Sequence, residues 1–314
     1  MAAEASRPIA VLTGPTGAGK TDFALGLAEE FALEIVSVDS AQVYRGLDIG
    51  SAKPDAATRA RVAHHLIDLV PPEANYSAGQ FVRDAARAIA DIEARGRIPL
   101  LVGGTMLYLR ALITGIAALP EANPEIRAAI DSQAARSGWP AMHARLAEVD
   151  PRAAERIHPN DAQRIQRALE VFRATGEPIS RLQTQTRSPL AREFACVALV
   201  PHDRARLQTA LAERFDRMME DGLLQEVEGL HARGTLTAEH PAIRAVGYRQ
   251  LWEHLEGACS LETARARAVA ATRQLAKRQM TWLRSMPNIR AVDPHEAQSF
   301  VGLRESLNAA FCLL

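Results

Sequence analysis

The stretch VLTGPTGAGKTDFA, residues 11–24, decides the fold, because a short apolar run leads into a glycine-rich loop and then into a helix-like segment. Residues Gly14 to Thr21 match the pattern G-x-x-x-x-G-K-[ST]. In that pattern, backbone N–H groups, a lysine and the start of a helix together surround phosphate groups. The stretch therefore predicts a P-loop, the phosphate-binding turn that follows the first strand of an α/β domain.

The surrounding sequence alternates between strand-like and helix-like segments. Short apolar runs, typical of buried parallel strands, occupy residues 8–13, 34–39 and 98–104. Between them, residues 20–31 and 77–95 have apolar side chains spaced by three and four, as in helices. This alternation predicts an α/β fold of the P-loop NTPase type, with a doubly wound parallel sheet. Such folds bind ligands at the carboxyl ends of their strands, which here carry the P-loop, Asp39–Ser40 and Gly103–Thr105.

The character of the sequence changes near residue 116. Residues 121–182 are rich in Ala, Arg and Glu, with helical periodicity and no convincing strand, whereas residues 192–203 are strand-like again. We therefore predict a core of residues 1–115 and 195–314 with a helical C-terminal part, interrupted by an all-helical insertion domain, residues 116–194.

The composition is that of an ordinary globular protein. Hydrophobic residues make up 47% of the 314 residues, and 37 basic residues balance 37 acidic ones, so a nucleic-acid partner would need a local basic patch. Three widely separated cysteines, and histidines without ligand-like spacing, predict neither a disulfide framework nor a structural zinc site. The N-terminal sequence lacks the layout of a signal peptide and no apolar run is long enough to cross a bilayer, which predicts a cytoplasmic protein without a membrane partner.

Lys20 and Thr21 carry the chemistry expected of the P-loop. Lys20 supplies positive charge to phosphate, and a hydroxyl such as that of Thr21 commonly holds Mg²⁺. However, the run 98–104 is followed by no carboxylate of the kind that switch and motor NTPases use to hold the metal. This favours a transferase, in which phosphate is a handle or a leaving group. Three roles stay open for Asp39 on the residues alone: metal ligand, general base or helix N-cap.

A series of motifs connects the chain with one family. They are GPTGAGKT, DSAQVYRGLDIGSAKP, HHLIDL, LLVGGTMLYLRAL, RIHPNDAQRIQRALEVF, AIRAVGYRQLW and ATRQLAKRQMTWLR. In identity and order they resemble the motifs of bacterial tRNA dimethylallyltransferases, over residues 8–285. The resemblance implies that the P-loop holds the diphosphate of dimethylallyl diphosphate. It also implies that the prenyl group passes to the exocyclic amine of adenosine 37, next to the anticodon of a tRNA.

The resemblance also implies roles for individual residues. Asp39 is the implied general base, Thr105 lies beside the target base, and Lys20 stabilises the departing diphosphate. For Thr105, a helix cap is an equally good explanation from the sequence alone. The implied cofactor is Mg²⁺, held by Thr21. The residues implied to bind the diphosphate are Gly14, Pro15, Thr16, Gly17, Ala18, Gly19, Lys20, Thr21 and Arg244.

A further set of residues is implied to contact the anticodon stem–loop of tRNA. Residues 262–284 contain six Lys or Arg and one acid, which predicts phosphate contact, although without the resemblance a solvated basic helix face is the better explanation. The insertion domain is implied to clamp the RNA, and nothing in the sequence requires more than a monomer. The predicted tRNA-binding residues are Asp39, Ser40, Ala41, Gln42, Thr105, Arg127, Gln163, Arg164, Ile165, Gln166, Arg167, Arg244, Ala245, Val246, Gly247, Tyr248, Arg249, Arg273, Lys277, Arg278 and Arg284.

Two rival functions stay open on the residues alone. A P-loop kinase would share the loop and an acid after the second strand, but it normally carries a short arginine-bearing lid in place of a long helical insertion. A non-catalytic RNA-binding module would keep the loop only for folding, and the intact Lys20, Thr21 and Asp39 argue against that.

Overall fold

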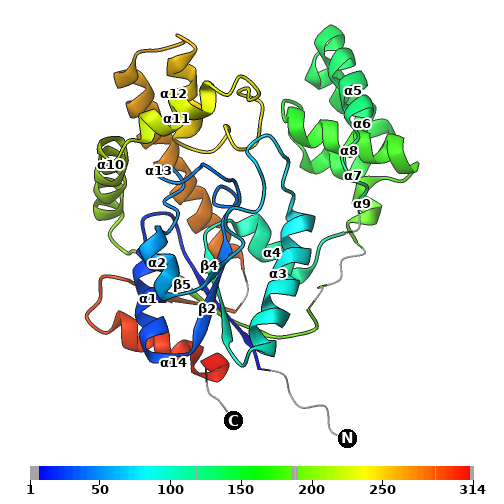
Figure 1. The fold of residues 1–314 in the computed structure, drawn as a ribbon. Coiled ribbons are helices and arrows are strands. Elements are labelled where there is room, and N and C mark those ends of the chain that lie inside the picture. The colour runs from blue at the N-terminus through cyan, green and yellow to red at the C-terminus, as the bar shows by residue number, and fades with distance from the viewer. Residues whose placement is uncertain (1–6, 118, 185–187, 189, 287, 312–314) are drawn as a thin grey trace, which may run out of the picture. The chain divides into compact units, whose positions relative to one another are not determined.

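The computed structural model describes residues 7–117, 119–184, 188, 190–286 and 288–311 (Figure 1). Its internal contacts divide the chain into two compact units. The first, called the sheet unit below, spans Met1–Ile113 and Pro189–Leu314; the second, the helical unit, spans Thr114–Ser188. Each unit has its own hydrophobic core, so each is described by itself.

A six-stranded parallel sheet forms the centre of the sheet unit. Its strand order is β3-β2-β4-β1-β5-β6, and every neighbouring pair is parallel. The strands are β1 (Ile9–Thr13), β2 (Leu33–Val38), β3 (His64–His65), β4 (Ile98–Gly103), β5 (Phe194–Leu199) and β6 (Ile289–Val292). The predicted α/β class and the four predicted strands are confirmed. The two edge strands were not predicted, because β3 has two residues and β6 has no continuous apolar run.

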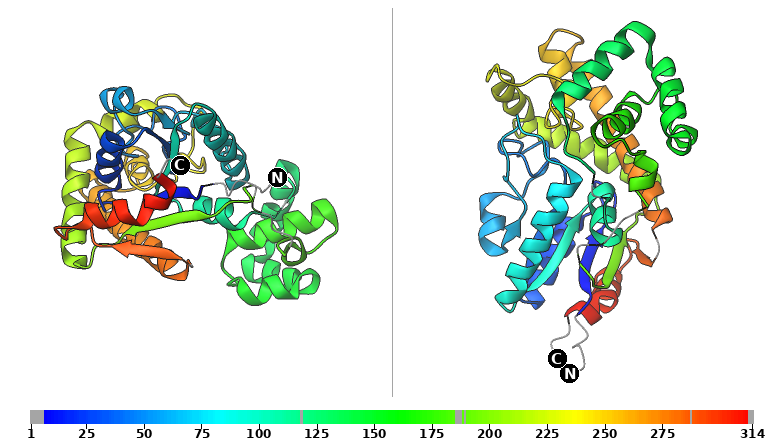
Figure 2. Two further views of the ribbon diagram at one scale, coloured as in Figure 1. Left: turned by 90° about the horizontal axis from the view of Figure 1, so that it is seen from below. Right: turned by 90° about the vertical axis from the view of Figure 1, so that its right-hand side faces the viewer.

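Alternating side chains of the strands face two separate cores. On β1, Ile9 and Val11 pack into one core, while Ala10 and Leu12 pack into the other. Helices α3 (Ala78–Ala94) and α4 (Met106–Thr114) cover the first core. Helices α1 (Lys20–Glu30) and α14 (Ser299–Phe311) cover the second, and Figure 2 shows α14, in red, beside the sheet in both views. Burial on both faces explains why these strands are nearly continuous apolar runs.

A third core lies among the helices that follow β5. It contains two large, fully buried aromatic side chains, Tyr248 and Trp252, which pack with apolar residues from three further helices and from the chain after β2. The remaining helices of the sheet unit are α2 (Ala56–Arg61), α10 (Arg204–Glu220), α11 (Leu223–His231), α12 (Tyr248–Leu255) and α13 (Leu261–Ser285). Among the described residues, no helix is both long enough and apolar enough to span a bilayer.

The helical unit contains only helices in its described part. Its core includes Ile130, Met142 and Ile165, all fully buried. Side chains of Asn123, Asp150 and Asp161 accept hydrogen bonds from the first backbone N–H groups of α5, α7 and α8, which fixes where these helices begin. The helices are α5 (Pro124–Ser137), α6 (Trp139–Val149), α7 (Pro151–Arg156), α8 (Ala162–Thr175) and α9 (Ile179–Leu182).

A buried carboxylate, Glu170, organises one side of the helical unit. It accepts hydrogen bonds from Arg127 (2.9 and 3.1 Å), from Arg167 (2.7 Å) and from the Asn123 N–H (2.7 Å). Burial opposes ionisation, but the hydrogen bonds from the two arginines outweigh it and lower the pKa of Glu170. The arginines therefore join α5 to α8 through one shared anion.

Replacing this anion should loosen the helical unit. We expect Glu170→Gln to lower the free energy of opening by about 2 kcal/mol, less than for a fully buried pair because both arginines are partly exposed. Amide hydrogen exchange in α5 and α8 measures this free energy. As a matched control, Glu177→Gln removes only an exposed pair with Arg181 at 3.8 Å, and should change it by about 0.3 kcal/mol. Equal effects of the two variants would contradict a special role for Glu170.

Candidate active site

The P-loop connects β1 to α1, as its pattern predicts. Gly17 and Gly19 have φ values of 80° and 77°, a left-handed conformation in which glycine is the least strained residue. The Lys20 ammonium folds back over the loop and donates to the carbonyl oxygens of Gly14 (3.0 Å) and Pro15 (2.8 Å). The loop is thus closed around its own lysine and holds that charge at the start of α1.

The charge of Lys20 is easily lost in this environment. Burial lowers the pKa of Lys20 to about 8; the nearby Asp39 carboxylate opposes this shift and the Arg214 guanidinium adds to it. A lysine with this pKa gains strongly from an anionic ligand, because the ligand restores the stabilisation that water would have supplied.

Asp39 begins a tight turn directly after β2. Its Oδ1 accepts hydrogen bonds from the N–H groups of Ala41 (2.8 Å) and Gln42 (3.3 Å). Among the described residues no hydrogen bond to its Oδ2 is present, and Asp39 lines the cavity described next. The structure therefore shows that the Asp39 carboxylate caps this turn.

Thr105 joins the end of β4 to this turn. Its Oγ1 accepts a hydrogen bond from the Ser40 N–H at 3.0 Å, and its own N–H donates to the Val38 carbonyl at 3.1 Å. The threonine hydroxyl thus positions the turn that begins at Asp39.

A cavity of about 660 Å³ lies where the P-loop, the Asp39 turn and the end of β4 meet. Helices α10 and α13 close it on the other side with Arg214 and Gln279. Arg214 is partly buried, and Asp39 and Asp22 act on it electrostatically; burial lowers its pKa, as does repulsion from Arg217, and the two acids oppose the shift. The cavity therefore combines three basic side chains, Lys20, Arg214 and Arg278, with the carboxylates of Asp22 and Asp39.

Gln279 connects the two sides of the cavity. Its Oε1 accepts a hydrogen bond from the Thr16 N–H at 2.9 Å, and its Nε2 donates to the Gly104 carbonyl at 2.8 Å. One amide on α13 therefore holds both the P-loop and the segment after β4.

Comparison with known proteins identifies the family. The profile described as "IPP transferase" matches residues 42–286, and the profile described as "Isopentenyl transferase" matches residues 8–69. The chain belongs to the IPP transferase family. This confirms the resemblance seen in the sequence motifs.

The relatives of this IPP transferase match it over most of their length. The tRNA dimethylallyltransferase of Methylibium petroleiphilum is 57% identical over 286 residues, 90% of this chain and 88% of the relative. That of Bordetella petrii is 53% identical over 289 residues, 91% and 92% of the two chains. Among solved structures, the tRNA isopentenylpyrophosphate transferase of Bacillus halodurans has a TM-score of 0.70 with 32% identity, covering 98% of this chain and 97% of that one. A eukaryotic dimethylallyltransferase acting on tRNA has a TM-score of 0.81 with 28% identity, covering 96% and 78%.

Many of the residues predicted to bind the diphosphate or the tRNA line the cavity. They are Thr16, Gly17, Gly19, Lys20, Thr21, Asp39, Ser40, Ala41, Gln42, Thr105, Ala245, Val246, Gly247 and Arg278. Gly14, Pro15 and Ala18 are buried and do not line it. The carbonyls of Gly14 and Pro15 hold Lys20, so these residues shape the loop from behind.

The structure bears on three of the predicted residues: Arg244, Ile165 and Tyr248. Arg244 is exposed and does not line the cavity, whereas Arg214 and Arg278 do. The side chains of Ile165 and Tyr248 are fully buried, so neither is available to an RNA surface. The Tyr248 hydroxyl instead donates a short hydrogen bond to Glu226. Apolar packing decides both positions.

Other residues predicted to bind RNA already form ion pairs or hydrogen bonds with side chains of this chain. Arg127 and Arg167 pair with Glu170, Gln166 donates to Asp131 at 2.6 Å, and Arg249 pairs with Glu253 at 3.1 Å. The side chains of Gln163 and Arg164 are exposed on α8. Arg273, Lys277 and Arg284 line a different groove, between α10 and α13.

Sequence reasoning missed Arg214 and Gln279. Both lie on long helices among many similar polar residues; Gln279 stands within the motif ATRQLAKRQMTWLR, but no residue type there distinguishes it from its polar neighbours. The helical register was the available signal: Leu207, Leu211 and Arg214 share one face of α10, and Leu211 meets Gly17 of the P-loop.

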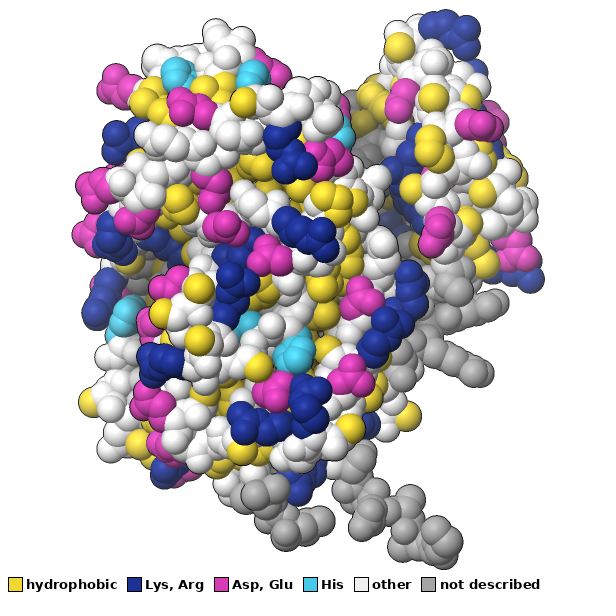
Figure 3. Space-filling model, in the orientation of Figure 1, with side chains coloured by type: hydrophobic (Ala, Val, Ile, Leu, Met, Phe, Trp, Pro, Cys, Tyr) yellow, Lys and Arg dark blue, Asp and Glu magenta, His cyan; other side chains and the backbone are white. Residues whose placement is uncertain are grey.

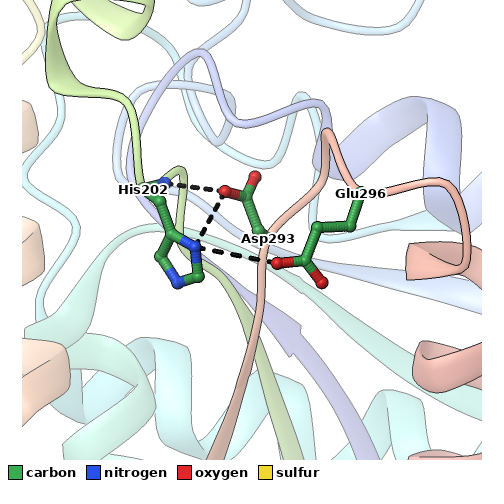
Figure 4. Close-up of side chains that lie close together, drawn as sticks. All are labelled: His202, Asp293 and Glu296. Atoms are coloured by element: carbon green, nitrogen blue, oxygen red, sulfur yellow. Dashed lines mark hydrogen bonds and ion pairs between the residues drawn. The ribbon is translucent and has the colours of Figure 1, made fainter.

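The structure also joins His202 to two acids that are distant in sequence (Figure 4). The Nδ1 atom of His202 lies 3.2 Å from Asp293 Oδ2 and 3.7 Å from Glu296 Oε1. Asp293 also accepts hydrogen bonds from the N–H groups of His202 (2.9 Å) and His295 (3.0 Å). These interactions connect the segment that follows β5 to the segment that follows β6, which explains why the three side chains lie together.

Proposed function

We propose that this chain transfers the dimethylallyl group of dimethylallyl diphosphate to the exocyclic amine of adenosine 37 in a tRNA. The observation that carries this proposal is the cavity that is lined both by a P-loop with a partly buried lysine and by an acid with one uncommitted oxygen. The names of the relatives, which are 53–57% identical, support the same reaction class. The coexistence of anion-binding and base chemistry in one cavity is what a prenyl transfer to an amine requires.

The diphosphate would bind at the P-loop. The N–H groups at the start of α1 and the Lys20 ammonium carry the positive charge on one side, and Arg214 carries it on the other. Negative charge builds on the diphosphate as its bond to the prenyl carbon breaks, so these groups stabilise the transition state more than the bound substrate.

The donor set in the cavity fits Mg²⁺, which prefers hard oxygen ligands. The Thr21 hydroxyl lines the cavity and would hold the ion together with diphosphate oxygens. When bound, Mg²⁺ neutralises charge on the leaving diphosphate.

Asp39 would take the proton from the amine. The lone pair of an adenine exocyclic amine is delocalised into the ring, so the nitrogen attacks efficiently only if its proton is removed as the C–N bond forms. The electron pair of the broken C–O bond leaves with the diphosphate. The hydrogen bonds to Oδ1 hold the carboxylate still, which leaves Oδ2 for this proton.

The prenyl chain requires an apolar wall that also excludes water, because water would otherwise take the allylic group. Such a wall is provided by Leu211, Phe215, Met218, Leu223, Leu275 and Trp282, which line the cavity. The adenosine would enter flipped out of its loop, which costs a few kcal/mol and less for a loop than for a duplex. The turn after Asp39 and residues 245–247 are the proposed contacts of the flipped nucleotide.

The low pKa of Lys20 predicts how donor binding depends on pH. The protonated ammonium binds the anion, so affinity is fully present well below pH 8 and falls as the pH rises through about 8, approaching about tenfold per pH unit. Calorimetric titration with dimethylallyl diphosphate from pH 7 to 9.5 measures this. Lys20→Arg should bind with an affinity that is nearly constant over the range. A constant affinity in the unaltered protein would contradict the assignment.

The function itself is tested by incubating the purified chain with Mg²⁺, dimethylallyl diphosphate and an unmodified anticodon stem–loop RNA. Mass spectrometry should find isopentenyladenosine at position 37 and nowhere else. RNA that binds without gaining the group would favour a non-catalytic RNA-binding module. No RNA binding, together with phosphate transfer from ATP to a small acceptor, would favour a kinase.

A further inference from the structure

The buried face of α13 carries a polar side chain among small and apolar ones. Every residue of α13 is described, and its buried residues are Ala264, Ala268, Ala276, Gln279 and Leu283. A buried amide needs hydrogen-bond partners to offset the loss of water, so the position of Gln279 on this face requires an explanation. Charge does not mark a comparable position on the face that Figure 3 draws, because Lys and Arg (dark blue) are interspersed there with Asp and Glu (magenta).

Gln279 lies where two segments of the cavity wall meet beyond the sheet. Thr13 and Gly103 are the last residues paired between β1 and β4. Past this pair, Gln279 accepts a hydrogen bond from the Thr16 N–H at 2.9 Å and donates one to the Gly104 carbonyl at 2.8 Å. The two bonds use the oxygen and the nitrogen of one amide. They therefore fix the orientation of the amide and the separation of the two segments at once.

The packing around Gly104 shows how close this approach is. A Cβ atom at this position would lie 2.6 Å from Gln279 Nε2 and 3.1 Å from the Gly14 carbonyl oxygen. Gly104 does not have a positive φ, so close approach and not backbone conformation is the reason for glycine here. The P-loop, the amide and the end of β4 thus form one tightly packed junction.

The segments that Gln279 joins carry the two halves of the proposed reaction. The P-loop would hold the diphosphate. On the other side, Thr105 follows Gly104 in the chain and accepts a hydrogen bond from the Ser40 N–H at 3.0 Å, in the turn that begins at Asp39. A continuous path of bonds therefore connects the diphosphate site, through Gln279, to the proposed proton acceptor.

We propose that Gln279 is a positioning residue for prenyl transfer, which sets the distance between the bound diphosphate and the attacking amine. This inference rests on the proposed function. The reacting atoms must lie about 3–3.5 Å apart, and a misplacement of about 1 Å costs about 10²-fold in rate. The amide has no charge, and its Oε1 and Nε2 are bonded to the backbone. Its loss should therefore slow the chemical step while each substrate still binds.

Gln279→Met tests this role, because methionine has a similar length and forms neither hydrogen bond. With saturating dimethylallyl diphosphate and anticodon stem–loop RNA, the single-turnover rate constant should fall by about 10–10²-fold. The dissociation constants of the donor and of the RNA, measured by calorimetry, should change by less than about threefold. Weaker binding and a lower thermal midpoint with an unchanged rate constant at saturation would indicate a structural role only and overturn the proposal.

A glutamine elsewhere in the sheet unit supplies the matched control. Gln225 is exposed on α11 and does not line the cavity. Gln225→Met makes the same chemical change and should keep the rate constant within about twofold, as is usual for surface substitutions. An equal loss of rate in this variant would contradict a specific role for Gln279.

Gly104→Ala disturbs the same junction from the other side. The added Cβ would displace Gln279 Nε2 without removing the amide, so this variant should also slow the transfer. If both substitutions act through one connection, the double variant should be no slower than the slower single variant. Losses that multiply would assign the two residues independent roles and overturn the proposal.

The outcomes also separate this inference from the proposed function. If the unaltered chain forms isopentenyladenosine and Gln279→Met is equally fast, the function stands and the positioning role fails. If the unaltered chain forms no isopentenyladenosine, the proposed function fails, and the positioning role fails with it.

Discussion

Asp39→Asn is expected to lower the rate constant of prenyl transfer by about 10²–10⁴-fold, because the amide cannot take the proton of the attacking amine. The variant keeps an oxygen that accepts the hydrogen bonds of Ala41 and Gln42, so the turn after β2 should persist. Single-turnover measurements with prebound donor and RNA report the chemical step directly. The affinity for dimethylallyl diphosphate should change far less than the rate.

Asp39→Ala serves as the comparison, since it removes both the base and the turn-capping oxygen. If capping were the whole role of Asp39, the asparagine variant would retain nearly full activity and only the alanine variant would lose it. Similar losses in both variants, with the fold of the asparagine variant intact, identify the proton acceptor.

Arg214→Gln should reduce kcat/KM by about 10²–10³-fold, the loss typical when a preorganised group facing a developing anion is removed. The reason is its place in the cavity wall, where its charge also acts on Asp39 and Lys20. Removing it should also raise the pKa of Lys20, because Arg214 lowers that pKa. Initial rates at varied donor concentration measure the first effect.

A neighbouring arginine makes the control specific. Arg217 lies three residues further along α10, is exposed, and does not line the cavity. Arg217→Gln removes one positive charge from the same helix and should keep activity within about twofold, since an exposed charge is screened by solvent. Equal losses of activity in the two variants would mean that Arg214 acts only through the net charge of the protein and not through its position in the cavity.

Much of the fold was predictable because local patterns agree with the final packing. The apolar runs at 8–13 and 98–104 are central strands buried on both faces, and the P-loop pattern carries its own geometry. Edge strands such as β6 have no such run, because only some of their side chains are shielded from solvent and the others can be polar. These strands form because they pair with a neighbouring strand in the folded protein, and that pairing cannot be seen in the local sequence.

The site was predictable only where a motif specifies it. Lys20, Asp39 and Thr105 follow strands, so parallel topology alone brings them to one edge. Arg214, in contrast, reaches the cavity only because α10 packs Leu207 and Leu211 against Gly17. The basic character of Arg127 and Arg167 predicted contact with RNA. In the structure, both guanidinium groups form ion pairs with the buried Glu170 of α8. Competing internal partners cannot be seen in composition.

The two hydrogen bonds of Gln279 have a consequence for biosynthesis. The bond to Thr16 spans 263 residues, and the bond to Gly104 spans 175. During translation, which releases the chain from its N-terminus, the P-loop and the end of β4 emerge long before α13 exists. A ribosome-bound chain that stops before residue 279 therefore lacks the clasp between them. The cavity beside the P-loop should therefore be complete only near the end of synthesis, when α13 docks.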